Sequence, residues 1–413
     1  MSPDSRIPGG GTSYASKDRL ACRRTVRSLM TDSPTALSGH ADNRSGMSTS
    51  VRALLVLALL YLFLTGVELL GGGFKYLGKD LVDGLFEGVS NPLGGFFVGL
   101  LATILVQSSS VSTSVIVGLV ASGVVGVDEA VPMVMGANVG TTVTAVLVSL
   151  AHMRRAQEFR RAFAAATVHD FFNVLAVLVF LPFEIATNYL SRTAGWITDQ
   201  VIGSSGASFR SPLKQAVKMP AGWVKDLLAD LGAHGDVLGG FLIVIGVAFI
   251  FVALAFITKN MRLLVADRVE AAINRALGAG SGMVAILIGA IITISVQSSS
   301  ITTSVLVPLA ASGVLTLENI YPVTLGANVG TTVTALLASL ATGSPAAVTV
   351  AIVHTLFNLS GIMVFYPIQA LRRVPIRLAR GLADIAMERR IMAVAYTVGM
   401  FVVVPLLGVV ILR

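Results

Sequence analysis

Long apolar segments separated by short polar ones dominate the chain from residue 52 onward. A helix rises about 1.5 Å per residue, so roughly 20 apolar residues cross the hydrocarbon core of a membrane. The pattern therefore predicts an all-α polytopic membrane protein. Seven segments are long enough to be transmembrane helices: 52–71, 131–151, 162–186, 237–258, 320–341, 347–369 and 391–412.

Two pairs of shorter apolar segments each surround a polar tetrad. Each segment is too short for a comfortable span, so we expect each pair to form a re-entrant helical hairpin. Irregular backbone at membrane depth is tolerated only where protein or a water-filled cavity surrounds it. The pairs are 92–106 with 111–126 around Gln107, Ser108, Ser109 and Ser110, and 282–296 with 301–316 around Gln297, Ser298, Ser299 and Ser300.

The tetrads belong to an internal repeat with a period of 190 residues. VQSSSVSTSVIVGLVASGVV at 106 matches VQSSSITTSVLVPLAASGVL at 296, and GANVGTT at 136 recurs at 326. HDFFN at 169 and HTLFN at 354 close the two copies. The predicted division is a disordered tail (1–50), a first transport repeat (51–186), an extracellular linker (187–236), a second transport repeat (237–371) and a basic segment with the last helix (372–413).

Positive charges predict the orientation, because short cytoplasmic loops carry most Lys and Arg residues. With the N-terminus inside, the basic segments 154–161 and 372–380 lie on the cytoplasmic side, and the uncharged linker 342–346 lies outside. The basic segment 259–275 falls inside, whereas its counterpart 72–90 falls outside. The repeats are therefore expected to be inverted, with a substrate site between them near the midplane.

Composition excludes an ordinary soluble protein, since 54% of the 413 residues are hydrophobic, 13% are charged and the mean hydropathy is +0.81. The net charge of +8 does not indicate nucleic-acid binding, because the basic residues occur in short segments between apolar runs. The only cysteine, Cys22, excludes disulfides and cysteine-rich metal sites. We interpret 187–236 as a loop. The alternative is that Trp196 and Trp223 in this segment lie at the membrane interface.

No Lys or Arg occurs between Gly88 and Met153 or between Ala276 and Leu371. An anion at the tetrads would therefore be bound by Ser hydroxyls, Gln and Asn amides, and the free N–H groups of the helices that follow QSSS. Helix N-termini bind anions through these groups and the positive end of the helix dipole.

A doubly charged anion is not neutralised by dipoles alone, so we expect bound cations beside it. Sodium prefers oxygen ligands, which the two GANVGTT copies could supply through Asn138, Asn328 and Thr hydroxyls such as Thr141 and Thr144. The alternative is that these small residues only allow close helix packing.

His169 and Asp170 form the only ionisable pair within a predicted crossing of the first repeat. An intramembrane acid indicates a functional site, here a cation ligand or proton carrier. A hydrogen-bonded core residue is the alternative for each histidine. His354 is followed by Thr355, so the two repeats are chemically unequal.

These motifs resemble the type II sodium–phosphate cotransporter family over residues 53–412. The resemblance implies a cell-membrane symporter of inverted repeats that imports inorganic phosphate with sodium by alternating access, without other cofactors. It implies that both tetrads, which we group with Asn138 and Asn328, surround phosphate. Its implied sodium ligands are Thr331, Thr334, Gln297, Ser298 and Asn173.

Asp170 is similar to the aspartate of electrogenic members, which implies an additional sodium ion and net charge movement. One departure is Arg155, which stands where animal relatives carry an aspartate before the FRRAF stretch. The resemblance therefore does not imply a sodium contact at this position.

Two other functions stay open at this point. An intramembrane serine hydrolase is one, although no GxSxG motif is present and Asp170 adjoins His169, which places them on different helix faces. A sodium-coupled transporter of sulfate or a dicarboxylate is the other. The expected partners are phosphate, sodium and the lipid bilayer, without nucleic acid, and the sequence does not indicate an oligomeric state.

Overall fold

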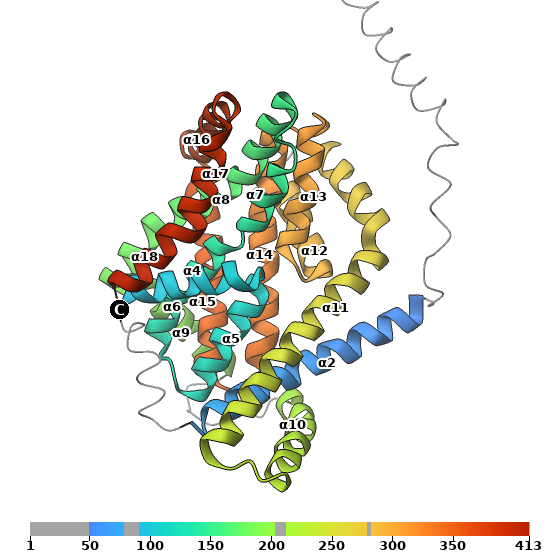
Figure 1. The fold of residues 1–413 in the computed structure, drawn as a ribbon, viewed down its shortest axis with the longest axis vertical. Coiled ribbons are helices and arrows are strands. Elements are labelled where there is room, and N and C mark those ends of the chain that lie inside the picture. The colour runs from blue at the N-terminus through green and yellow to red at the C-terminus, as the bar shows by residue number, and fades with distance from the viewer. Residues whose placement is uncertain (1–48, 78–90, 203–211, 279–281, 413) are drawn as a thin grey trace, which may run out of the picture. The chain divides into compact units, whose positions relative to one another are not determined.

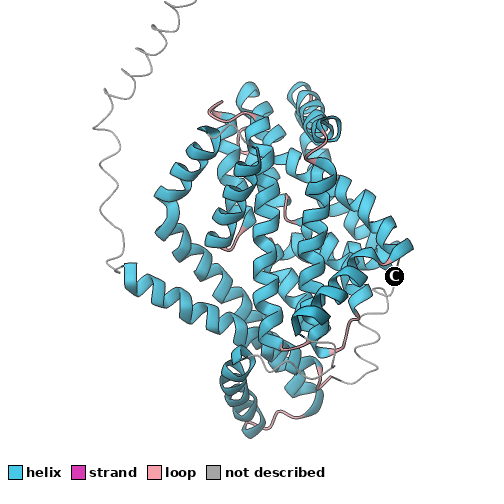
Figure 2. Cartoon of the chain, turned by 180° about the vertical axis from the view of Figure 1, so that it is seen from behind, coloured by secondary structure: helices cyan, strands magenta, loops and turns pink. Residues whose placement is uncertain are grey.

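The computed structural model describes residues 49–77, 91–202, 212–278 and 282–412. Contacts divide the chain into two compact units, Met1–Val51 and Arg52–Arg413, and the second contains everything described below except the first residues of α2 (Thr49–Phe74). The predicted tail lies almost entirely outside the described residues. All described elements are helices (Figure 1; Figure 2).

Seven described helical segments are long and apolar enough to cross a membrane, and each overlaps one predicted crossing. The prediction of an all-α polytopic membrane protein is confirmed. The segments are Ser50–Phe74, Val127–Leu150, Ala156–Thr187, Gly235–Met261, Leu317–Thr342, Pro345–Phe365 and Arg390–Ile411.

The four short apolar segments are separate helices, and the chain breaks at each tetrad. α4 (Pro92–Val106) ends at Gln107 and α12 (Gly282–Val296) ends at Gln297, and these two glutamines have φ angles of 57° and 56°. Left-handed backbone ends a helix. The next helices, α5 (Ser109–Ser122) and α13 (Ser299–Ala311), begin within two residues. Insertion of the two pairs from opposite membrane sides stays a prediction.

The glycines of both GANVG segments pack helices in close contact. Gly136 lies on α6 (Val127–Gly140) and Gly326 on α14 (Leu317–Thr342). A Cβ atom at Gly136 would overlap the carbonyl oxygen of Phe96 on α4, and one at Gly326 would overlap that of Ile286 on α12. Small residues let helix backbones approach in this way. The packing alternative is therefore correct for the glycines of these motifs.

The largest buried core lies around α8 (Ala156–Thr187), α14 and α15 (Pro345–Phe365). Phe163 and Phe172 from α8, Tyr321 from α14 and Phe357 from α15 are fully buried there. The helices α14 and α15, orange in Figure 1, each contact both α5 and α8. The three helices α8, α14 and α15, which also carry polar residues, therefore share one apolar core.

The prediction of a loop at 187–236 was wrong, because two helices occupy it: α9 (Tyr189–Ile202) and α10 (Pro212–Asp230). Leu190, Ala194 and Thr198 are buried on one face of α9, at helical spacing. The buried carboxylate of Glu184 accepts hydrogen bonds from the amides of Leu190 (2.6 Å) and Ser191 (3.0 Å), which stabilises the start of α9. Trp196 and Trp223 are exposed.

Two earlier helices of the described chain are α7 (Val143–Leu150) and α11 (Gly235–Gly278), and four elements follow α15. α16 (Gln369–Glu388) is amphipathic and packs on α8. The last crossing consists of α17 (Arg390–Val398), a π-helical turn (Gly399–Val403) and α18 (Val404–Ile411). Pro405 lacks an amide hydrogen, which explains why the regular α-helical ladder is interrupted just before it.

Candidate functional site

The glutamine of each tetrad is held in one orientation by two hydrogen bonds. In the first copy, Gln107 donates from Nε2 to the carbonyl of Ile104 (2.6 Å) and accepts at Oε1 from Thr144 (3.2 Å). In the second copy, Gln297 donates to Ile294 (2.7 Å) and accepts from Thr334 (2.9 Å). The structure thus brings Thr144 and Thr334, two of the predicted threonines, against the tetrads.

The serines of the tetrads form the N-termini of α5 and α13. Ser108 and Ser298 are the N-cap residues, and their hydroxyl oxygens accept from the amides of Val111 (3.3 Å) and Ile301 (3.4 Å). Such caps leave other first-turn N–H groups free for a ligand. Ser109, Ser110 and Ser299 are buried in the first turns, and Ser300 is half-buried.

The two tetrads lie next to each other although 187 residues separate the atoms that meet. The Ser110 hydroxyl donates to the carbonyl oxygen of Gln297 at 3.5 Å. The positive ends of two helix dipoles therefore meet at one place, where an anion could be bound without a basic side chain.

A buried cluster of asparagines lies between the two copies of GANVG. The Oδ1 atom of Asn173, on α8, accepts from Asn138 (3.2 Å) and from Asn328 (2.7 Å), and Asn173 donates back to the Asn138 carbonyl (3.0 Å). All three side chains are buried. The structure therefore brings together the predicted residues Asn138, Asn328 and Asn173.

The two histidines extend this cluster crosswise between the copies. His169 contacts Asn328 Oδ1 through Nε2 (2.6 Å), and His354 contacts Asn138 Oδ1 through Nε2 (3.4 Å). Both are buried, as the core alternative predicts. Asn358, which also donates to Asn138 Oδ1 (3.3 Å), was missed, although its place in HTLFN matches that of Asn173 in HDFFN.

Three buried atoms of this cluster have no hydrogen-bond partner among the described residues: Nδ1 of His169, Nδ1 of His354 and Oδ1 of Asn358. Buried polar atoms are nearly always paired with protein or water. The cluster can therefore accept a water molecule or a hard cation.

Asp170 is fully buried and lies in a second polar site. Its Oδ1 atom accepts from Thr142 (2.9 Å), and its Oδ2 atom accepts from the hydroxyl of Tyr396 on α17. No basic side chain of the described residues pairs with it. Because a buried carboxylate is costly without a compensating charge, this site suits a cation.

The hydroxyls of the other two predicted threonines donate to backbone carbonyls, which leaves their oxygen atoms able to accept. The hydroxyls of Thr141 and Thr331 donate to carbonyls of their own helices, at Ala137 (3.2 Å) and Ala327 (3.0 Å). Thr142 reaches Asp170 instead and was missed by the sequence analysis. Tyr396 was also missed, and no sequence motif near it indicates this contact.

Arg155 is separate from both polar sites. Its side chain is 77% exposed and pairs with Glu158 at 2.9 Å. Arg155 therefore provides no buried acid to either site.

The geometry does not support a serine hydrolase within the described residues. The tetrad serines contact backbone groups, and His169 contacts an asparagine rather than a serine. No described group of three or more His, Cys, Asp or Glu side chains could hold a metal ion. The oxygen-rich sites instead suit an alkali cation.

Comparison with known proteins agrees with this chemistry. The family model described as Na+/Pi-cotransporter matches residues 62–195 and 241–379. Sodium-dependent phosphate transport protein 2B of Pongo abelii is 32% identical over 444 residues, which cover 86% of this chain and 64% of the relative. Sodium-dependent phosphate transport protein 2A of Ovis aries is 32% identical over 434 residues, covering 88% and 68%.

The chain thus spans about two thirds of the length of these relatives. No solved structure matches it. With both family segments matched and both tetrads in contact, the chain belongs to the Na+/Pi-cotransporter family.

Proposed function

We propose that this protein is a sodium-coupled symporter that imports inorganic phosphate across the cell membrane by alternating access, with net movement of positive charge. Its family consists of transporters rather than enzymes, and the matched relatives are named sodium-dependent phosphate transport proteins. The observation that carries the proposal is the contact between the two tetrads, where α5 and α13 both begin.

Phosphate binds between the tetrads in this proposal. The two helix N-termini supply N–H donors and partial positive charge, and the serine hydroxyls can both donate and accept. Thr144 and Thr334 hold the glutamine amides in place. The Asn138 and Asn328 amides, which we group with the phosphate ligands, join the two repeats through Asn173.

Sodium binds to the oxygen-rich groups beside the phosphate. Gln297, Ser298, Asn173, Thr331 and Thr334 are the proposed ligand set, with Thr141 and Thr144 as the matching positions of the first copy. Asp170 holds an additional sodium ion, since it is buried beside hydroxyl donors without a basic partner. This extra charge makes transport electrogenic, and no other cofactor is required.

The cytoplasmic location of the N-terminus, the extracellular location of 187–236 and the inverted repeats belong to the same proposal. They are supported by the distribution of basic residues. Cysteine substitutions at Arg154 and Ser344, probed with a membrane-impermeant reagent in intact cells, test this orientation. Labelling is expected at position 344 only, and labelling at position 154 contradicts it.

Uptake in proteoliposomes tests the function. We expect accumulation of labelled phosphate that requires an inward sodium gradient and increases at inside-negative potential. Equal uptake with potassium in place of sodium would exclude sodium coupling.

Replacement of Asp170 by glycine separates charge coupling from transport. Transport by Asp170→Gly is expected to persist at a reduced rate without its dependence on membrane potential. If the variant gives the same currents as the unmodified protein, Asp170 does not carry the charge coupling.

Selectivity among anions is the remaining alternative, because a site made of dipoles and hydroxyls discriminates by size and geometry. Competition of labelled phosphate uptake by sulfate and by a dicarboxylate tests this. Stronger inhibition by either anion than by unlabelled phosphate would assign the site to that anion.

A further inference from the structure

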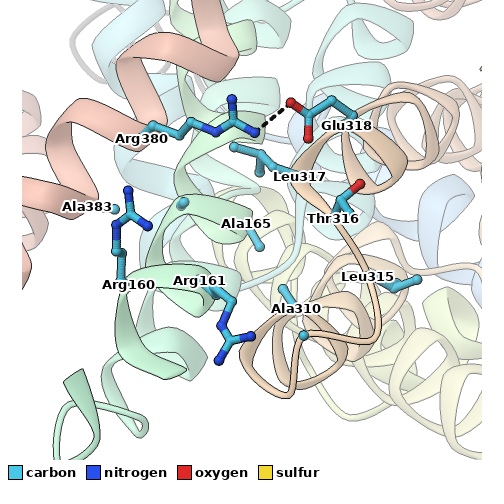
Figure 3. A pocket seen from close by; sticks show the side chains of 12 residues that line it. Arg160, Arg161, Ala165, Ala310, Leu315, Thr316, Leu317, Glu318, Arg380 and Ala383 are labelled. Carbon is cyan, nitrogen blue, oxygen red and sulfur yellow. Dashed lines mark hydrogen bonds and ion pairs between the residues drawn. The ribbon is translucent and has the colours of Figure 1, made fainter. Parts of the chain in front are cut away.

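A second site with basic side chains lies away from the tetrads, at one end of α8. It is a pocket of about 340 Å³ between α8, the turn that joins α13 to α14, and α16. Figure 3 shows Arg160, Arg161 and Arg380 around it. None of the proposed phosphate or sodium ligands lines this pocket.

Two of the three arginines are already paired with acids. Arg160 donates from Nε to Asp384 on α16, and Arg380 donates to Glu318 at the start of α14 (2.5 Å). An arginine has five N–H donors, so each guanidinium keeps donors for a further acceptor. These ion pairs connect α8 to α16 and α16 to α14 around the pocket.

Arg161 has no carboxylate partner among the described residues. Its one hydrogen bond runs from Nε to the carbonyl of Gln157 in its own helix (3.3 Å). Its guanidinium lies over Gly313, where a Cβ atom would overlap it. The pocket therefore contains an uncompensated positive charge that faces the α13–α14 turn.

The pocket lies where charged sequence changes to apolar sequence in α8 and in α14. Apolar runs begin at Ala162 in α8 and at Ile320 in α14. Six apolar residues line the same pocket: Ala164, Ala165, Ala310, Leu315, Leu317 and Ala383. Such a boundary is typical of the membrane surface, and basic pockets between membrane helices bind lipid head groups.

The third wall of the pocket is α16, whose apolar face packs on α8. Pro375, Ile376, Ala379 and Ala383 are buried on that face, while Arg377 and Arg380 are exposed. Exposed basic residues near a membrane surface attract anionic lipid head groups. A ligand with a phosphate group and an apolar part therefore fits all the walls of this pocket.

We propose that this arginine pocket binds a phosphate group, carried by an anionic lipid or by free inorganic phosphate, at a site distinct from the transport site. The guanidinium groups bind the phosphate oxygens, for which their planar fork is suited. The apolar lining contacts the lipid body when the group is a head group.

The test compares Arg161→Gln with the full-length protein in phosphatidylcholine nanodiscs. One arm adds phosphatidylglycerol and measures retained lipid by native mass spectrometry. The other arm omits anionic lipid and measures thermal stabilisation by inorganic phosphate. Arg377→Gln is the matched control, because it removes one exposed arginine of α16 that does not line the pocket.

We expect Arg161→Gln to weaken phosphatidylglycerol retention about fivefold, as the loss of one surface cation predicts, and Arg377→Gln to weaken it much less. A loss confined to the inorganic phosphate arm would identify free phosphate as the ligand. Equal behaviour of the two variants in both arms overturns the proposal. Arg161→Lys, which keeps the charge and loses the fork, is expected to show an intermediate loss and replaces Arg161→Gln if that variant is not recovered.

Discussion

The hydroxyl of Tyr396 donates a hydrogen bond to the carboxylate of Asp170, 226 residues earlier in the chain. Tyr396 belongs to α17, outside both copies of the repeat. The last crossing is therefore connected to the acid that distinguishes the first copy from the second. Thr142 provides the other donor.

Replacement of Tyr396 by phenylalanine should make the protein more dependent on sodium for its stability. Loss of a donor to a buried carboxylate costs roughly 1.5–3 kcal/mol. Sodium at Asp170 would compensate part of this cost. We expect a lower unfolding temperature for Tyr396→Phe in choline buffer and a larger increase on adding sodium than the unmodified protein shows.

Tyr321→Phe is the control for that measurement, because the Tyr321 hydroxyl is buried without a partner among the described residues. Its sodium response should equal that of the unmodified protein. If Tyr396→Phe also shows the same sodium response as the unmodified protein, Tyr396 does not contribute to cation binding.

The asymmetry between the copies predicts unequal effects of two equivalent threonines. Thr142→Val removes a donor to Asp170, whereas the hydroxyl of Thr332, the matching residue, has only the Val329 carbonyl as a hydrogen-bond partner among the described residues. Thr142→Val should change the sodium concentration for half-maximal uptake about two- to tenfold, and Thr332→Val should leave it nearly unchanged. Similar shifts for both variants would contradict this prediction.

Thr334 should act through the orientation of Gln297. Thr334→Val conserves shape but removes the 2.9 Å hydrogen bond to Gln297 Oε1, so the amide is no longer fixed. We expect sodium-dependent phosphate uptake to require about two- to tenfold more substrate, with protein stability nearly unchanged. Thr332→Val is again the control. If the two variants give the same uptake curve, Thr334 does not act by orienting Gln297.

The glycines of the two GANVG segments should be intolerant of any side chain. Gly136→Ala and Gly326→Ala place a methyl group against the carbonyls of Phe96 and Ile286, and overpacking of this kind costs roughly 1–3 kcal/mol or more. Both variants should unfold at lower temperature in detergent. Gly240→Ala, whose added Cβ would meet open space, is the control and should be neutral or stabilising.

Much of the fold follows from the sequence alone. Lipid cannot satisfy backbone polar groups, so long apolar runs must be helices, and each of the seven predicted crossings overlaps a helix. The helix break at each tetrad could also be predicted, because four polar residues interrupt an apolar run. The helices α9 and α10 were not predicted, since neither has an apolar run long enough to span a membrane and the Gly, Ser and Pro residues around them resemble a loop.

The sequence by itself determined which residues are polar within the membrane, because each such residue is costly there and stands out from its apolar neighbours. Only the tertiary structure decided which of them meet. The crosswise pairs His169 with Asn328 and His354 with Asn138, and the choice of Thr142 rather than Thr141 as the partner of Asp170, depend on how helices far apart in the chain rotate and pack. Helix periodicity tells on which face of its helix a residue lies but not which other helix packs against that face. The contact between Tyr396 and Asp170 could therefore be identified only from the packed helices.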